Sequence, residues 1–137
     1  MEKQLSYLEQ AKKFFANDLY ATECTGITIE AAEPGYAKCS LAIEPRHCNA
    51  LGNPMGGAIF TLADFAFAIA SNLGQAPTVS LSSNITYLSA AKGKKLFAET
   101  AKIKSGYSTC LYQIQVYDEL GTQVAHITTN GFISRKK

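Results

Sequence analysis

The sequence predicts an α+β fold in which one antiparallel β-sheet wraps around a central, buried α-helix. The first observation behind this prediction is that residues 58–73 are almost wholly apolar, with Asp64 as the only charged residue among them. A helix that is apolar on every side belongs inside a protein, and Gly74 is a typical residue to end one. The second observation is the set of strand-like segments around this helix, two within residues 25–43 and four at residues 78–88, 94–104, 108–118 and 122–133.

The two segments before the helix read as a β-hairpin. They flank the turn residues Glu33-Pro34-Gly35, and the second segment alternates apolar and other residues from Tyr36 to Ile43. Residues 46–57 are then rich in Asn, Pro and Gly, which predicts a loop that ends where the buried helix begins.

The four later strands are joined by short connections at residues 90–93, 105–107 and 119–121. Short connections of this kind predict antiparallel neighbours in one sheet. The two-residue alternation of side chains that is typical of a strand is clearest from Cys110 to Tyr117. No repeat and no change in composition marks a second domain, so we expect a single domain over residues 1–137.

The N-terminal residues predict a separate amphipathic helix. Leu5, Leu8, Phe14 and Phe15 lie among Glu, Gln and Lys within residues 4–18, which is typical of a surface helix with one buried stripe. We therefore expect residues 1–20 to form a helical cover for the domain.

Composition excludes several classes of protein. The chain has 137 residues, 47% hydrophobic and 18% charged with a net charge of +2, which is ordinary for a globular protein and argues against disorder. The positive residues form no stripe, so we expect no nucleic-acid partner. The apolar helix is shorter than the roughly 20 residues that cross a bilayer, so we expect no membrane span. No apolar stretch of signal-peptide length begins the chain, which favours the cytoplasm.

The four cysteines, Cys24, Cys39, Cys48 and Cys110, form no Cys-x-x-Cys pair and have no histidines at zinc-binding spacing. We expect free thiols and no metal site. The adjacent residues His47 and Cys48 do not suggest a nucleophilic pair, because such a pair needs side chains that face each other. We expect His47 to be an exposed loop residue.

Asp64 is the first candidate for chemistry. A carboxylate in apolar surroundings is costly to ionise unless it meets a partner or water in a cleft, and burial would raise its pKa. Helical spacing places Phe60, Ala68 and Ser71 on its face. Asp64 could serve as a base or a nucleophile, or it could bond a backbone group where two helices cross.

Gly56 and Gly57 are the second candidate. A helix that begins with two residues lacking side chains presents open backbone N–H groups at the positive end of its dipole, which is a common way to build an oxyanion hole. A tight turn or a close packing contact would also explain the pair. Gly56 and Asp64 lie eight residues apart, or about 12 Å along one helix, so they cannot contact the same carbonyl group.

If the two residues act together, one must come from a second chain across a two-fold axis. The small residues Ala63, Ala66 and Ala70 form a stripe that would allow another element to approach closely. A homodimer is therefore expected.

The run Asn49-x-x-Gly52-x-x-Met55-Gly56-Gly57, followed by Phe60-Thr61-Leu62-Ala63-Asp64-x-Ala66-Phe67-Ala68, resembles the hotdog-fold acyl-CoA thioesterases, specifically the phenylacetate-degradation (PaaI-like) branch. Further along, Tyr87-Leu88, Gly93, Ser105-Gly106 and Asp118-x-x-Gly121 resemble the strand and turn pattern of that family. The similarity covers about residues 20–134.

This resemblance implies the hotdog fold, dimers that often pair into tetramers, and hydrolysis of an acyl-CoA thioester, here with an aromatic or medium-chain acyl group. It implies that the Gly56 N–H binds the thioester oxygen, that Asp64 of the partner subunit is general base or nucleophile, and that Asn49 holds the attacking water or the substrate. Coenzyme A belongs to the substrate, and no other cofactor is implied. The expected substrate-binding residues are Gly57, Met55, Phe60, Ala68 and Tyr87, with Ser105 and Gly106 near the nucleotide or pantetheine arm.

One departure from the family pattern is Met55, which stands where the family usually has a histidine. This leaves a non-catalytic acyl-CoA-binding or regulatory protein as an alternative, whereas a hotdog dehydratase is disfavoured because it would need that histidine. Lys92, Lys94, Lys95 and Lys104 are candidate partners for the phosphates of coenzyme A, although lysines in turns are often simply solvated.

Overall fold

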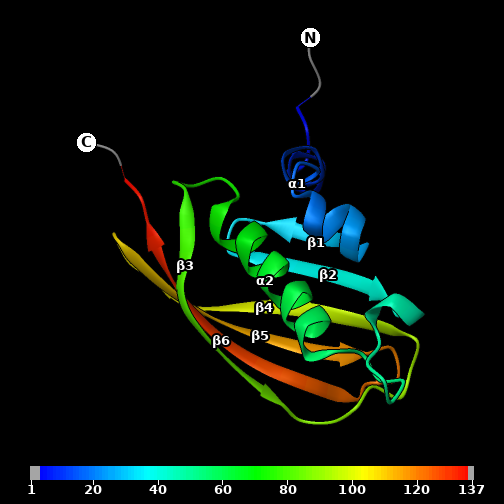
Figure 1. Ribbon diagram of the computed structural model, residues 1–137. Helices are drawn as coiled ribbons and strands as arrows, with labels where there is room; N and C mark the ends of the chain where they lie inside the picture. The colour runs from blue at the N-terminus through cyan, green and yellow to red at the C-terminus, as the bar shows by residue number, and fades with distance from the viewer. Residues whose placement is uncertain (1–3, 136–137) are drawn as a thin grey trace.

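The computed structural model describes residues 4–135, so residues 1–3 of the predicted N-terminal cover lie outside the described residues (Figure 1). The elements follow one another along the chain as α1 (Tyr7–Phe15), η1 (Tyr20–Thr25), β1 (Thr28–Glu33), β2 (Tyr36–Ala42), η2 (Pro45–His47), α2 (Gly56–Asn72), β3 (Thr78–Tyr87), β4 (Lys95–Ser105), β5 (Thr109–Asp118) and β6 (Gln123–Ile133).

The six strands form one sheet in the order β1-β2-β4-β5-β6-β3, and every neighbouring pair is antiparallel. The sheet curves around α2, which lies along its concave face (Figure 1). The predicted fold class, an antiparallel sheet wrapped around a long helix, is therefore confirmed. The β1–β2 turn holds Pro34 followed by Gly35 at φ +86°, the residue order that a type II turn requires.

The expectation that β3 and β4 are neighbours was wrong. β3 instead pairs with β6 at the edge of the sheet, with Thr78 opposite Ile133 and Tyr87 opposite Ala125. The connection at residues 88–94 therefore passes the ends of β6 and β5 before β4 begins. Three strand spacings amount to about 14 Å, and seven extended residues span more than that, so a short connection does not require adjacent strands.

The turn after β5 holds this crossing connection. The Asp118 carboxylate, only 1% exposed, accepts hydrogen bonds from the backbone N–H groups of Lys92 and Gly93, both at 2.9 Å. It also accepts from Leu120 and Thr122 within its own turn, at 3.0 and 2.8 Å. The neighbouring Glu119 carboxylate accepts from the backbone of residues 94 and 95.

The core lies between α2 and the sheet. Leu62 and Ile69 are fully buried, and the Phe67 ring packs edge-to-face on Tyr112 with centroids 5.4 Å apart. The small stripe of Ala63, Ala66 and Ala70 is also fully buried. The element that approaches this stripe is thus the chain's own sheet, and the stripe does not support the prediction of a dimer.

The N-terminal helix is shorter than predicted. It begins after Ser6, whose side chain accepts a hydrogen bond from the Glu9 N–H at 3.1 Å, as a helix N-cap does. It buries Ala11 and Phe15, and the Phe15 ring packs edge-to-face on Phe65 of α2. Phe14 is 68% exposed and does not belong to the buried stripe.

The π-helical turn η1 was not predicted. The predicted N-terminal helical segment ends at residue 20, and Thr25, the last residue of η1, belongs to a predicted strand segment. Gly26 follows it at φ +86°, and the N–H groups of Gly26 and Ile27 both bond the Ala21 carbonyl. This places residues 18–25 beside α2, on the side of the helix away from β3 (Figure 1).

Candidate active site

The start of α2 is open. Gly56 is its first residue, and the side chain of Met55 before it makes no capping hydrogen bond. The Ala58 and Ile59 N–H groups bond the Met55 carbonyl, but within residues 4–135 the N–H groups of Gly56 and Gly57 have no hydrogen-bond partner. Two unpaired donors at the positive end of a helix dipole can bind a negatively charged oxygen.

Tyr87, at the end of β3, holds this helix start in place. Its hydroxyl donates a hydrogen bond to the Gly56 carbonyl oxygen at 3.0 Å. A Cβ atom added at Gly56 would lie 2.6 Å from the Tyr87 hydroxyl oxygen, whereas one added at Gly57 would meet nothing within 4 Å. Gly56 must therefore be a glycine for Tyr87 to approach, and the close packing contact considered from the sequence is present at Gly56 alone.

Asn49 organises the loop that leads to this helix. Its side-chain oxygen accepts hydrogen bonds from the Leu51 and Asn53 N–H groups at 3.0 and 3.1 Å, and its backbone N–H bonds the Asn53 carbonyl. An isolated bridge between Cys48 and Pro54 closes the loop. The side-chain oxygen of Asn49 is thus occupied by hydrogen bonds within the loop, and the side-chain amide nitrogen is the atom left to contact water or a substrate.

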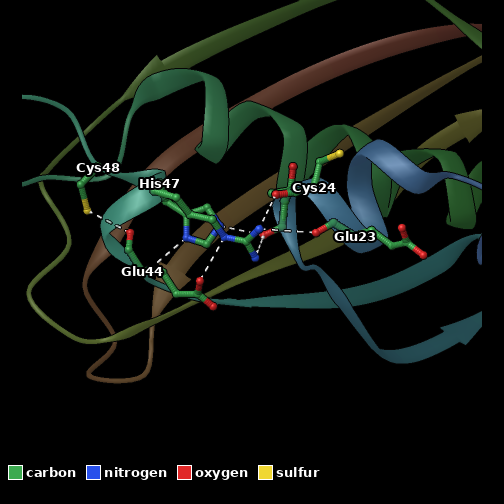
Figure 2. A network of polar contacts seen from close by, with 7 residues as sticks. Glu23, Cys24, Glu44, His47 and Cys48 are labelled. Carbon is green, nitrogen blue, oxygen red and sulfur yellow. Dashed lines mark hydrogen bonds and ion pairs between the residues drawn. The ribbon is translucent and has the colours of Figure 1, made fainter.

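The prediction that His47 is exposed was wrong, since its side chain is only 5% exposed. Its Nδ1 atom accepts a hydrogen bond from the Glu44 N–H at 3.0 Å, and its Nε2 atom lies 2.7 Å from the Thr25 carbonyl oxygen (Figure 2). These partners assign the neutral tautomer with the proton on Nε2. Cys48 bonds the Glu44 carbonyl instead of the ring, so no Cys–His pair forms.

Arg46 joins the same network. Its guanidinium donates to the Cys24 carbonyl at 2.8 Å and, at longer range, to the carbonyls of Glu23 and Thr25. It also pairs with the Glu44 carboxylate at 3.0 Å. Figure 2 shows how these contacts connect the end of η1 to the residues that precede the Asn49 loop.

Asp64 lies on the outward face of α2, exposed within a single chain. Within residues 4–135 it makes no hydrogen bond, so it does not bond a backbone group at a helix crossing. Asp64 lines a groove of about 300 Å³ between α2 and residues 18–21, which include the start of η1. The groove is lined by Asp18, Leu19, Tyr20, Ala21, Thr61, Asp64, Phe65 and Ala68.

Partial burial in this groove, followed by repulsion from Asp18, raises the pKa of Asp64 above its usual value. A carboxylate with a raised pKa binds a proton more tightly and is therefore a stronger base. Ala68 lines the groove beside it and Phe60 is half-buried. Ser71 is not on this face, because it is fully buried and its hydroxyl donates to the Phe67 carbonyl.

The structure does not bring every expected residue together. Gly56 and Asp64 both belong to α2, eight residues and about 12 Å apart, so one chain holds them too far from each other to share a carbonyl group. Ser105 is the last residue of β4 and Gly106 follows it, whereas Lys95 begins that strand at the end near Gly56. An eleven-residue strand is about 33 Å long, so within one protomer this turn is remote from the helix start.

The candidate lysines for the coenzyme A phosphates also lie at opposite ends of the sheet. Lys92 and Lys94 are exposed in the crossing connection, at the end of the sheet where α2 starts. The Lys95 ammonium lies 5.3 Å from the centre of the Phe97 ring, and Lys104 is at the far end of β4.

The prediction of free cysteines is confirmed, with Cys24 exposed, Cys48 half-buried, and Cys39 and Cys110 buried. Over residues 4–135, no three His, Cys, Asp or Glu side chains gather as metal ligands would. In the same range the helices are too short or too polar to span a membrane.

Sequence reasoning missed one wall of the site. Asp18, Tyr20 and Arg46 stand beside the groove or hold its wall, and none of them was a candidate. The available signal was Gly26, since a glycine between a helical and a strand-like segment commonly ends a helix in the left-handed conformation.

Unpaired N–H groups at a helix start can bind a developing oxyanion, and a carboxylate on the outer face of the same helix can act as a base or a nucleophile. The chain belongs to the thioesterase superfamily, whose family model matches residues 51–125. This match includes Gly56, Asp64 and Tyr87, and with it the resemblance drawn from the sequence is confirmed.

Individual relatives agree with this placement. A putative esterase of Archaeoglobus fulgidus is 32% identical over 124 residues, covering 90% of this chain and 80% of the relative. The human protein named acyl-coenzyme A thioesterase 13 is 37% identical over 83 residues, 58% of this chain and 59% of the relative.

Two solved structures share the fold. A mutant of the phenylacetic acid degradation protein PaaI from Thermus thermophilus superposes with a TM-score of 0.77 at 30% identity, covering 82% of this chain and 97% of that one. A Streptococcus mutans protein solved with acetyl-CoA bound superposes with a TM-score of 0.75 at 26% identity, covering 81% and 90%. The chain is thus a thioester hydrolase of the PaaI-like type.

Proposed function

We propose that this protein hydrolyses acyl-CoA thioesters with an aromatic or medium-chain acyl group, giving the free acid and coenzyme A. The names of the human relative and of the Thermus PaaI structure, and the acetyl-CoA held by the Streptococcus protein, support this class of substrate. The observation that carries the proposal is the pair of unpaired N–H donors at the start of α2, Gly56 and Gly57.

In this proposal the thioester oxygen accepts a hydrogen bond from the Gly56 N–H. That bond strengthens as the carbonyl becomes a tetrahedral oxyanion, so it lowers the barrier to attack. Asp64 either removes a proton from the attacking water or attacks the carbonyl carbon itself. When Asp64 acts as a base, it passes the proton taken from water to the leaving sulfur, and the C–S bond breaks to give the acid and the coenzyme A thiol. When Asp64 attacks, the C–S bond breaks to leave a mixed anhydride on Asp64; the leaving sulfur takes a proton from water, and a water molecule then hydrolyses the anhydride to the free acid. Neither route requires a metal or a further cofactor.

The site is proposed to form between two chains, because one α2 helix separates Gly56 from Asp64 by about 12 Å. The free edge of β3 supports such a homodimer. One side of β3 pairs with β6, and the strand is exposed along almost its whole length, including the apolar side chains of Val79 and Leu81. An open edge of this kind can pair with the same strand of a second copy. Two such dimers are proposed to associate as a tetramer.

The substrate also needs contacts for its charged end. Lys92 and Lys94 are the proposed partners for the coenzyme A phosphates, because they are exposed near the helix start. We further propose a cytoplasmic location, where the four free thiols would stay reduced.

A non-catalytic acyl-CoA-binding protein is a second candidate. The observation that favours it is Met55, which stands 52% exposed directly before the two glycines and offers no polar group to the substrate. Such a protein would retain acyl-CoA without releasing coenzyme A.

The test measures release of free coenzyme A from acetyl-, hexanoyl-, decanoyl- and phenylacetyl-CoA by the wild type and by Asp64→Asn. We expect the wild type to hydrolyse at least one longer or aromatic substrate and the variant to be slower by about 10²- to 10⁴-fold, the usual contribution of a general base. Equal rates for the two proteins would contradict the mechanism, and binding without turnover by the wild type would favour the second candidate.

A further inference from the structure

Two adjoining cavities run along α2 on the side where residues 18–25 lie. One is the groove of about 300 Å³ beside Asp64, and the other, of about 310 Å³, extends to Met55 and Gly57 at the start of the helix. Tyr20 and Thr61 line both cavities, so the two adjoin along this side of α2, one beside the open helix start and the other beside the carboxylate; together they are called the groove. Their combined size is within the range of small-molecule sites.

The charges of this groove select the part of an acyl-CoA that could occupy it. Asp18 and Asp64 are both carboxylates and would repel the phosphates of coenzyme A. Among residues 4–135, the one cation that lines the groove is Arg46, and it is already engaged with Glu44 and with backbone carbonyls. An uncharged occupant is therefore favoured over the nucleotide.

The walls beside Asp64 are suited to an apolar occupant. They are formed on one side by Phe65 and Ala68 of α2 and on the other by Leu19, Tyr20 and Ala21. Tyr20 is 70% exposed and Leu19 is 53% exposed, so these large side chains do not pack into the core. The acyl group is the apolar part of the substrate that lies next to the reacting carbonyl carbon.

The wall that carries Tyr20 is held by specific contacts. It is a single π-helical turn, a rare element that occurs frequently at functional sites. The carbonyls at its end are bound by Arg46 and His47, the latter at 2.7 Å. A Cβ atom at Gly26 would lie 2.7 Å from the Arg46 guanidinium, so the glycine gives this side chain its room.

We propose that η1 is the wall that selects the acyl group, with Tyr20 as the specificity-determining side chain and with Arg46 and His47 as positioning residues that fix η1 against α2. This inference rests on the proposed hydrolysis of acyl-CoA and assigns its acyl subsite. Removing the Tyr20 ring widens the groove beside Asp64 and leaves the helix start and the carboxylate unchanged.

The test compares Tyr20→Ala with the wild type over acetyl-, hexanoyl-, decanoyl- and phenylacetyl-CoA. We expect kcat/KM for the decanoyl or phenylacetyl substrate to change about tenfold or more relative to acetyl-CoA, the scale of discrimination by one apolar contact. Tyr7→Ala is the matched control, because Tyr7 is an exposed tyrosine of α1 that lines neither cavity. Its profile is expected to equal that of the wild type.

Arg46→Ala tests the positioning role. We expect it to raise KM for the longer substrates severalfold with little change in kcat for acetyl-CoA, and Arg46→Lys to restore part of the loss. An active wild type with the same acyl-group profile as Tyr20→Ala would overturn the inference and leave the proposed hydrolysis intact. A wild type that releases coenzyme A from no substrate would overturn the proposed function itself, and the assigned subsite with it.

Discussion

The hydroxyl of Tyr87 donates a 3.0 Å hydrogen bond to the carbonyl oxygen of Gly56, which joins the end of β3 to the first residue of α2. The helix start has no side-chain cap, and this bond ties it to the sheet. Changes at either residue should therefore disturb the site that the two glycine N–H groups form.

Gly56→Ala should weaken both stability and activity. Its Cβ atom would lie 2.6 Å from the Tyr87 hydroxyl oxygen and 2.9 Å from Cζ, so the ring must move and its hydrogen bond is lost. We expect the free energy of unfolding to fall by about 1–2 kcal/mol in urea denaturation, and coenzyme A release to fall at least about tenfold. Gly57→Ala is the control for stability, because nothing lies within 4 Å of its Cβ position. Equal unfolding curves for the two variants would contradict the contact.

Tyr87→Phe removes the hydroxyl and retains the ring. One neutral hydrogen bond contributes about 1 kcal/mol, so we expect a loss of that size in the free energy of unfolding. The Gly56 N–H is retained in this variant, and kcat should fall less than it does in Gly56→Ala. A kcat below that of Gly56→Ala would mean that the Tyr87 hydroxyl contacts the substrate directly.

Asp64→Asn should leave the fold intact and change how stability depends on pH. The folded state raises the pKa of Asp64, so ionisation is less favourable there than in the unfolded chain. The wild type should accordingly lose stability as pH rises above about 3.9, the ordinary aspartate value, until the folded group has ionised. The variant lacks this loss and should be at least as stable at pH 7 in thermal denaturation. A less stable variant at pH 7 would indicate a structural role.

Asp118→Asn should loosen the connection between β3 and β4. Burial opposes ionisation of Asp118, but the hydrogen bonds from Gly93, Lys92 and Thr122 outweigh it and hold its pKa well below the usual range. A lowered pKa stabilises the fold above the ordinary aspartate pKa, and this contribution is lost as pH falls through the folded value. We expect a lower Tm at pH 7 and faster proteolysis within residues 88–94. An unchanged Tm would show that the carboxylate does not hold the connection.

The strands and the buried helix could be predicted because their residues repeat with the period of the element. Residues 58–73 are apolar on every side, and β3 to β6 begin and end within one residue of the predicted bounds. The pairing of β3 with β6 could not be predicted in this way, since the length of a connection limits how far two strands lie apart and not which strands are neighbours.

Site residues could be predicted where they differ in kind from their neighbours in the sequence. They were missed where their burial or position depends on residues far along the chain. Asp64 is the only charge in its helix, so it was apparent from the sequence. His47 is buried, and its Nε2 atom meets the carbonyl oxygen of Thr25, a residue 22 positions earlier in the chain that the sequence does not reveal as a neighbour. Tyr20 belongs to a single π-helical turn, which is too short to produce a repeating hydrophobic pattern in the sequence.

The claim that two chains build one site is tested most directly by mixing two inactive variants. Asp64→Asn removes the carboxylate, and Gly56→Pro removes the N–H donor. Met55 before it already has the extended conformation that precedes a proline (φ −66°, ψ 147°). The proline Cβ atom displaces the Tyr87 ring, as the Cβ atom of Gly56→Ala does. Circular dichroism would first show that both variants fold. After the mixed chains reassociate at random, half of the dimers should combine the two variants, and each of these should hold one intact site. We therefore predict that coenzyme A release recovers to about a quarter of the wild-type rate. A mixture as inactive as its two components would contradict a site shared between chains.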